Sequence, residues 1–177
     1  DVITAYRTSD VIEHLEWKSL KEIDWQENYE IEDIRFRALP VKHFGWRFPW
    51  ERDRSKGFFK TGRGYNAYLM EHNGKKIVFG GDTAFTESFT ALQDEGIEVA
   101  IMPIGAYNPW KSVHCDPEEA LKMADQMRAK YFIPIHCYTF KQGVAPVSEP
   151  LKWLVTSAPN YDTRLGLVQI GQTLKLV

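Results

Sequence analysis

Hydrophobic positions along the chain follow two patterns, one typical of strands and one typical of helices. Continuous apolar runs and polar–apolar alternation predict strands over residues 2–6, 30–41, 65–70, 76–79, 99–104 and 131–135. Helical spacing predicts helical segments over residues 11–20, 85–93, 117–127 and 146–158. Strands that alternate with helices and are themselves nearly continuous apolar runs predict a sheet covered on both faces or lying between layers. The expected fold class is α/β or α+β, in a single domain over residues 1–177.

Turn signals predict how neighbouring strands connect. Asn73-Gly74 separates two strand-like runs, and this dipeptide is the strongest short signal for a hairpin. Gly171-Gln172 predicts a closing hairpin between residues 165–170 and 173–176. In the strand predicted around Asp33, the alternation slips by one position, which indicates a bulge at that point.

One helix start is marked clearly by its capping residues. Asp116 is the predicted N-cap, Pro117 takes the first helical position, and Glu119 follows at the third. Residues 8–10 form a similar polar loop that is expected to cap the amphipathic stretch over residues 11–20.

Residues 44–64 are rich in aromatic residues, Arg and Gly and show no period, so they predict a long loop. Residues 44–52, directly after His43, mix aromatic residues with Arg. That mixture fits a phosphate group attached to an apolar body, because Arg pairs with phosphate and aromatic rings offer contact area. Alternatively, the aromatic side chains pack this loop onto the domain.

Composition narrows the function classes. The chain has 177 residues, 44% of them hydrophobic, which is enough for one domain with a substantial core. With 22 basic and 24 acidic side chains its net charge is −2, so it carries no electrostatic footprint for nucleic acid. The sequence contains no transmembrane run and no signal-peptide pattern, which favours a cytoplasmic location, with peripheral membrane association as the alternative. Because the chain begins at Asp1 and not at Met, we expect a processed or excised piece.

Three ionisable residues follow apolar strands directly, namely His43, Asp82 and His136. Strand ends on a rigid scaffold often present side chains to a shared site. Two imidazoles and a carboxylate suit zinc or a neighbouring first-row metal. Alternatively, each histidine is a satisfied structural residue and Asp82 is a turn residue that hydrogen-bonds its own backbone.

His114 lies in a loop, two residues before the predicted N-cap Asp116. A histidine at a helix N-terminus can meet an anion or a substrate oxygen, aided by the helix dipole. The alternative is an ordinary surface loop residue. The two cysteines, Cys115 and Cys137, make no CxxC metal knuckle, and Cys137 is expected to be a small buried hydrophobe.

Taken in order, several segments resemble the metallo-β-lactamase-fold hydrolases, and within them most closely the N-acyl-phosphatidylethanolamine-hydrolysing phospholipase D group. The resemblance spans residues 39–140. The segments that carry it are Leu39-Pro40-Val41-Lys42-His43-Phe44, Phe79-Gly80-Gly81-Asp82-Thr83, Pro103-Ile104-Gly105-Ala106-Tyr107, His114-Cys115-Asp116-Pro117-Glu118-Glu119-Ala120 and Ile135-His136-Cys137-Tyr138-Thr139-Phe140.

The resemblance implies an αββα sandwich that holds two zinc ions. It implies that His43 completes the first zinc site, that Asp82 bridges the two ions, and that His136 completes the second site. His114 would lie beside the phosphate or the leaving group of the substrate, and a hydroxide held between the ions would be the nucleophile. The implied substrate is a small-molecule or lipid-like phosphodiester, with a lactone- or amide-like ester as the alternative.

One signature of that family is missing. Its His-x-His-x-Asp-His run supplies most of the metal ligands, and no two histidines in this chain are separated by one residue. We therefore expect the C-terminal portion of the fold, truncated on its N-terminal side, with partial or empty zinc occupancy. Loss of much of the first sheet predicts self-association or pairing with the missing N-terminal half. The alternative is an inactive remnant that serves as a binding or assembly module.

Overall fold

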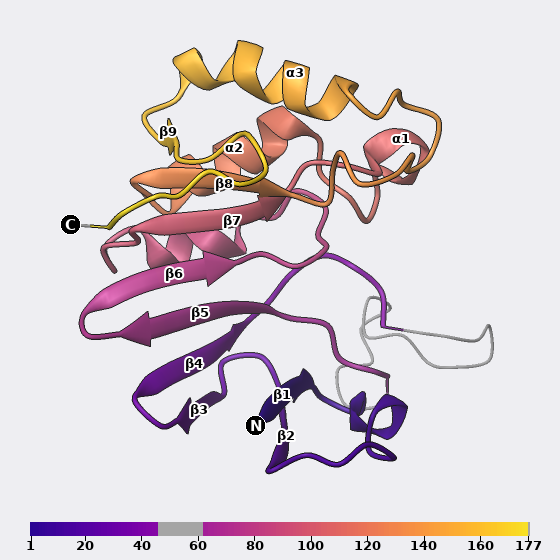
Figure 1. Ribbon diagram of the computed structural model, residues 1–177, viewed down its shortest axis with the longest axis vertical. Coiled ribbons are helices and arrows are strands. Elements are labelled where there is room, and N and C mark those ends of the chain that lie inside the picture. Colours follow the sequence, from indigo (N-terminus) through magenta and orange to yellow (C-terminus); the bar gives the residue numbers. More distant parts are fainter. Residues whose placement is uncertain (46–61, 177) are drawn as a thin grey trace.

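A mixed sheet of seven strands forms the centre of the structure (Figure 1). The computed structural model describes residues 1–45 and 62–176. In spatial order, which is also chain order, the strands are β3 (Asn28–Ile31), β4 (Ile34–Leu39), β5 (Ala67–His72), β6 (Lys75–Phe79), β7 (Val99–Pro103), β8 (Tyr131–Ile135) and β9 (Arg164–Leu165). Neighbours are antiparallel from β3 to β6 and parallel from β6 to β9. Strands β4, β6, β7 and β8 therefore run in one direction, and their carboxyl ends share one edge of the sheet. The predicted mixed class of strands and helices is confirmed.

A smaller sheet pairs β1 (Val2–Ala5) in parallel with β2 (Leu20–Ile23). The helix expected over residues 11–20 is wrong, since only a 3-10 turn, η1 (Ser9–Val11), and further turns precede β2. The Trp17 side chain stays 40% exposed, so a helix there would bury little apolar surface.

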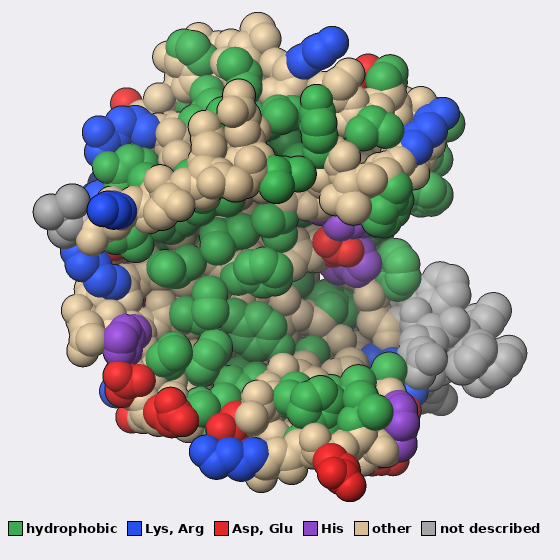
Figure 2. Space-filling view, viewed as in Figure 1, with side chains coloured by type: hydrophobic (Ala, Val, Ile, Leu, Met, Phe, Trp, Pro, Cys, Tyr) green, Lys and Arg blue, Asp and Glu red, His purple; other side chains and the backbone are tan. Residues whose placement is uncertain are grey.

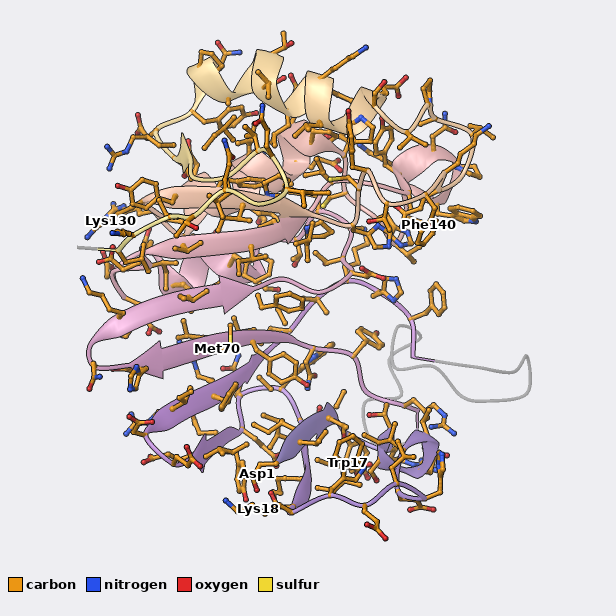
Figure 3. All side chains as sticks on the ribbon, viewed as in Figure 1. Asp1, Trp17, Lys18, Met70, Lys130 and Phe140 are labelled. Carbon is orange, nitrogen blue, oxygen red and sulfur yellow. The ribbon has the colours of Figure 1, made fainter. Side chains whose placement is uncertain are left out.

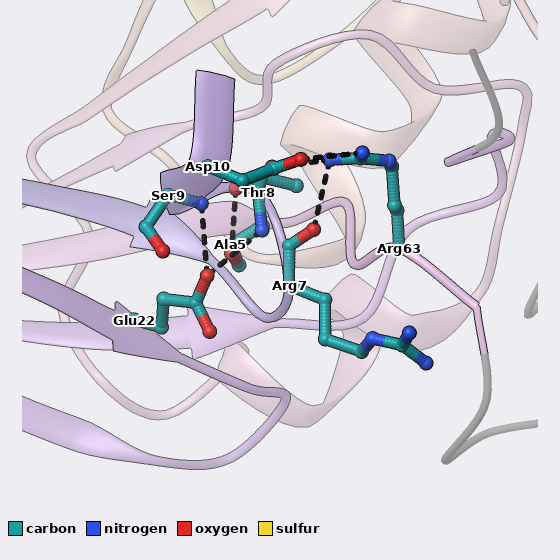
Figure 4. Close-up of polar contacts among 7 residues, drawn as sticks. All are labelled: Ala5, Arg7, Thr8, Ser9, Asp10, Glu22 and Arg63. Atoms are coloured by element: carbon teal, nitrogen blue, oxygen red, sulfur yellow. Dashed lines mark hydrogen bonds and ion pairs between the residues drawn. The ribbon is translucent and has the colours of Figure 1, made fainter. Parts of the chain in front are cut away.

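Side-chain hydrogen bonds support the turns of this N-terminal region (Figure 4). The Glu22 carboxylate accepts the backbone N–H groups of Thr8 and Ser9 at 2.9 and 2.8 Å. Arg63 donates to both carboxylate oxygens of Asp10, at 2.5 and 2.7 Å. These contacts join the small sheet to the segment that leads into β5. Of the loop predicted over residues 44–64, residues 46–61 lie outside the described part of the chain.

Both antiparallel hairpins of the large sheet turn at residues with positive φ. Strands β5 and β6 are joined by Asn73 at φ +48° and Gly74 at φ +73°, which confirms the predicted hairpin. Strands β3 and β4 are joined through Glu32 at φ +56°. The single bulged strand predicted over residues 30–41 is therefore wrong, because the slip near Asp33 is a turn between two paired strands.

Helix α2 (Pro117–Gln126) begins where its capping residues predict. The Asp116 carboxylate accepts the N–H of Glu119 at 2.9 Å, and the Glu119 carboxylate accepts the N–H of Asp116 at 3.1 Å. Figure 1 shows α2 behind the large sheet, and its apolar side chains enter the main core with those of β7. That core includes Leu69, Val78, Ala100, Met102, Ala120, Leu121, Met123, Ala124, Phe132 and Leu154.

The remaining helical elements within residues 1–45 and 62–176 are short. They are the 3-10 helix η3 (Ser88–Leu92), within the helix predicted over residues 85–93, α1 (Tyr107–Trp110), α3 (Glu149–Ser157), within the helix predicted over residues 146–158, and η4 (Ala158–Asn160). Among the residues that the structure describes, no helix combines the length and the hydropathy needed to cross a bilayer.

The closing hairpin predicted over residues 165–170 and 173–176 is wrong. Arg164 and Leu165 pair in parallel with β8, and the chain beyond them forms no strand up to residue 176. The turn itself forms, because the Gln172 side chain accepts two backbone N–H groups at 2.9 and 3.0 Å. The turn at Gly171-Gln172 therefore forms although the segments on its two sides do not pair as strands.

The side of the large sheet opposite α2 carries a second apolar surface, here called the apolar sheet face. Its residues, which are neighbours across adjacent strands, are Phe36, Tyr68, Met70, Ile77, Phe79, Ile101 and Ile133. None of them belongs to the buried core, and Phe79 is 38% exposed. Figure 2 shows hydrophobic side chains gathered across this side of the sheet, and Figure 3 shows Met70 among them.

An ion-pair cluster of Glu95 with Arg37 and Lys76 offers a test of pH-dependent stability. Burial opposes ionisation of Glu95, but hydrogen bonds from Arg37 and Lys76 outweigh it and hold the pKa of Glu95 below its usual value of 4.5. We expect Glu95→Gln to lower the free energy of unfolding by about 1 kcal/mol at pH 7. The stabilisation is complete above that usual pKa and is lost as the pH falls through the lower pKa of the folded protein.

Denaturant unfolding of the wild-type chain and of Glu95→Gln between pH 7 and pH 3 measures the difference in their free energies of unfolding. Asp94→Asn is the matched control, because the Asp94–Arg128 pair is 78% and 69% exposed at its two side chains and should contribute little. A Glu95→Gln difference that stays constant as the pH falls would show that the ion pairs do not stabilise the fold.

Candidate metal centre

The side chains of the four predicted site residues lie together at the edge of the sheet formed by the carboxyl ends of the strands. They are His43, Asp82, His114 and His136. His43 follows β4, Asp82 follows β6, and His136 follows β8, while His114 comes from the loop before α2. Since these three strands run in the same direction, the segments after them meet. Figure 2 shows histidine and acidic side chains together in a hollow at this edge.

The distances place His114 between the other two imidazoles. Its ring centroid lies 5.2 Å from that of His43 and 5.3 Å from that of His136. His136 Nε2 is 3.6 Å from Asp82 Oδ1. One ligand atom from each of His43, Asp82 and His114 lies within 4.8 Å of the others. The sequence named these four residues, but it did not indicate that His114 would lie this close to the metal-ligand candidates.

The hydrogen bonding of His43 indicates which of its nitrogens can bind a metal. Nδ1 lies 3.0 Å from the carbonyl oxygen of Phe44, and because a carbonyl can only accept, Nδ1 must donate. In the neutral ring this leaves a lone pair on Nε2. That atom is buried and has no hydrogen-bond partner among the described residues. A backbone carbonyl on the other ring nitrogen is the usual arrangement around a histidine that binds a metal.

The other two imidazoles each carry a similar unsatisfied atom. Nδ1 of His114 and Nδ1 of His136 are buried without a partner in the described part of the chain. Buried polar atoms are normally hydrogen-bonded, so three unpaired ring nitrogens in one cluster fit a site built for a bound group. Nitrogen donors with one carboxylate suit zinc or another first-row metal ion.

Burial lowers the pKa of His114, and positive charge on His43 and His136 lowers it further, while the Asp82 carboxylate opposes the effect. His114 is therefore neutral at neutral pH. A neutral imidazole can accept a proton, donate one, or bind a metal ion.

Two features of the site were missed from the sequence. The Gln142 side chain lies 3.3 Å from His136 Nε2. Gly105 allows the loop after β7 to approach His136, since a Cβ at this position would lie 1.9 Å from the His136 carbonyl oxygen. A glycine directly after a predicted buried strand was the available signal for Gly105, but no sequence signal marks Gln142.

Cys137 and His72 are not part of the candidate metal centre. Cys137 is half-buried, and burial raises the pKa of its thiol, which agrees with the predicted small hydrophobe. His72 is exposed and lies 2.6 Å from an oxygen of Asp33, at the opposite end of β5 from the site.

Comparisons with known proteins relate this chain to a family. Residues 2–137 match the beta-lactamase superfamily domain. An uncharacterized protein of Mycobacterium tuberculosis is 30% identical over 157 residues, which cover 85% of this chain and 40% of that protein. N-acyl-phosphatidylethanolamine-hydrolyzing phospholipase D 1 of Caenorhabditis elegans is 28% identical over 169 residues, covering 87% of this chain and 45% of that protein.

A solved structure with a similar fold is the metallo hydrolase Igni18 from the archaeon Ignicoccus hospitalis. Its TM-score is 0.59 at 18% identity, over 91% of this chain and 63% of that one. At this identity the likeness concerns the fold alone. The chain spans less than half the length of the two curated relatives named above.

Proposed function

The chain belongs to the beta-lactamase superfamily, and on that basis we propose that it carries part of the active site of a zinc-dependent hydrolase that acts on a phosphodiester. The metallo-β-lactamase fold predicted from the sequence is confirmed by the family match and by the fold neighbour. The observation that carries the proposal is the convergence of three imidazoles on one carboxylate, each with a buried nitrogen that has no partner within residues 1–45 and 62–176.

We assign His43, Asp82 and His136 as the residues that would hold two zinc ions, with Asp82 as the ligand that both ions would share. When bound, such ions supply Lewis-acid activation of water and of a phosphoryl oxygen. The Phe44 carbonyl fixes the ring of His43 with Nε2 toward the cluster. The Asp82 side chain is 42% exposed and has two oxygens, so it would have acceptor capacity for a shared ligand role.

His114 is assigned a place beside the substrate. Because burial keeps it neutral, its ring N–H can donate a hydrogen bond to a phosphoryl oxygen or to the leaving group. We expect His114→Ala to lower turnover about 100-fold or more while zinc content stays near normal.

Turnover and zinc content of the same preparations test this assignment. His72→Ala is the matched control, since His72 is exposed and pairs only with Asp33 and its neighbour Asn73 in the described structure. Zinc lost together with the His114 ring would contradict the assignment and make His114 a ligand, a role its distance from His43 and Asp82 also permits.

Aromatic side chains around the site support a substrate with an apolar body. Trp110, Tyr138 and Phe140 are 49%, 52% and 65% exposed. The Trp110 ring lies 6.5 Å from that of His114, and Figure 3 shows Phe140 at the same end of the sheet. A lipid-like phosphodiester fits a metal site that is bordered by exposed aromatic side chains. The name of the nematode relative, which describes hydrolysis of a phospholipid, supports the same substrate class. We propose a cytoplasmic location, with peripheral membrane association as the alternative.

The apolar sheet face supports a proposed partner. We propose that it is covered by a second copy of the chain or by a polypeptide that carries the His-x-His-x-Asp-His segment. The second arrangement would also complete the metal ligands.

Hydrolysis of bis(p-nitrophenyl) phosphate, compared with a simple lactone, tests the proposed reaction. The assay uses the zinc-treated chain alone and together with a polypeptide that supplies the missing ligand segment. Zinc-dependent release of nitrophenol that EDTA abolishes is the expected result. Faster lactone opening would favour a lactonase-type hydrolase. A chain that binds no zinc in either form would favour a binding or assembly module.

A further inference from the structure

Thr83 is a fully buried polar residue at the centre of the loops that form the site. It follows Asp82 directly and is 0% exposed. Its hydroxyl donates to the Ala84 carbonyl at 2.8 Å and accepts the backbone N–H of Lys42 at 3.0 Å. Its own carbonyl oxygen accepts the N–H of Cys115 at 2.7 Å.

Each of these contacts reaches a segment that carries a site residue. Lys42 precedes His43, and Cys115 follows His114. Ala84 also donates its N–H to the Lys42 carbonyl at 2.8 Å, which forms an isolated antiparallel bridge between the two segments. Side-chain and backbone groups of Thr83 thus connect three segments that otherwise lie outside the strands of the sheet.

We propose that Thr83 is a positioning residue that sets the relative placement of His43, Asp82 and His114. The proposal rests on the proposed metal centre in these residues. The Thr83 hydroxyl donates its single hydrogen to the Ala84 carbonyl. A lone pair of the hydroxyl oxygen therefore accepts the Lys42 N–H, and this bond fixes the segment that ends in His43. A metal ion is sensitive to such placement, because its donors must lie within a few tenths of an ångström of the required distances.

Two substitutions separate placement from mere burial. Thr83→Val keeps the shape of the side chain but removes both hydroxyl hydrogen bonds, whereas Thr83→Ser keeps the hydroxyl. Thr163→Val is the matched control, because Thr163 is 2% exposed and its hydroxyl donates to Asp125 at 2.8 Å, among elements that hold none of the site residues. Only Thr83→Val removes the side-chain hydrogen bond to Lys42, which holds the segment that ends in His43, while the backbone bonds to Cys115 and Lys42 stay in all three variants.

Cobalt(II) titration of the full chain, followed by its visible absorption bands, measures both affinity and ligand geometry. We expect Thr83→Val to weaken cobalt binding about tenfold or more and to change the absorption bands, as loss of an outer-shell partner does. Thr83→Ser and Thr163→Val should retain the wild-type bands and affinity. Unchanged bands in Thr83→Val, or equal changes in Thr163→Val, would overturn the positioning role.

Imidazole proton resonances of the metal-free chain give a second reading that does not depend on cobalt. We expect the signals of His43 and His114 to shift in Thr83→Val and to stay in place in Thr83→Ser and Thr163→Val. If the wild-type chain binds no cobalt, the proposed metal centre is contradicted. Shifted resonances in Thr83→Val would still support the positioning role of Thr83. Resonances that do not move in Thr83→Val would overturn it.

Discussion

Replacing Asp82 by alanine is expected to cost the most activity of any single change in the site, more than about 100-fold in turnover. Loss of an outer-shell partner typically costs 10–100-fold, and Asp82 is proposed to contact the metal centre itself. Its carboxylate lies 3.6 Å from His136 and within 4.8 Å of donor atoms of His43 and His114, so its removal affects every other donor. Zinc content should fall in the same variant.

Both quantities are measured on the chain supplied with the His-x-His-x-Asp-His segment, as turnover of the phosphodiester and as zinc per chain. Asp33→Ala is the control, because Asp33 also contacts a histidine, His72, at 2.6 Å but on the exposed opposite end of the sheet. A variant of Asp82 that keeps its zinc and its turnover would contradict the bridging role.

The second large effect concerns the apolar sheet face. At about 25 cal/mol per Å² of apolar surface, several hundred Å² left in water costs on the order of 10 kcal/mol. That cost is comparable with the entire stability of a typical domain, about 5–15 kcal/mol. We therefore expect the chain alone to self-associate at micromolar concentration through this face, and we expect Phe79→Lys to weaken the association strongly.

Analytical ultracentrifugation of the chain and its variants measures this effect. Val155→Lys on α3 is the control, because Val155 is 48% exposed on a helix that is not part of the apolar sheet face. A monomer with a sharp thermal transition and no binding of an apolar dye would contradict the expectation, as would equal dissociation of both variants.

The parts of the fold that were predicted correctly depend on local physics. The Asn73-Gly74 turn and the Asp116 capping box require only residues next to one another in sequence, and both formed as expected. The buried strands β7 and β8 were recognisable as continuous apolar runs, because a strand covered on both faces has no polar side.

The wrong predictions concern pairing between distant segments. Strand β2 forms because Leu20–Ile23 pairs with residues 2–5. The helical spacing over residues 11–20 does not indicate this pairing with a distant segment. Likewise, residues 165–176 have a turn signal, but β9 uses β8 as its partner. Local patterns cannot say which of several strands a segment will join.

The candidate site was partly predictable for a related reason. His43, Asp82 and His136 follow apolar strands directly, so parallel strand direction brings them to one edge. The central place of His114 and the contacts of Thr83 depend on how loops cross in space, and spacing in the sequence does not encode that crossing.

The most direct test of the metal centre is a crystal of the full chain grown with zinc, with anomalous differences measured at the zinc absorption edge. We predict a peak within about 2.0–2.2 Å of His43 Nε2, of an Asp82 oxygen or of a His136 ring nitrogen, at the edge where these side chains converge. An empty cluster in crystals that bind zinc elsewhere, with the His43 and His136 nitrogens satisfied by water, would contradict it.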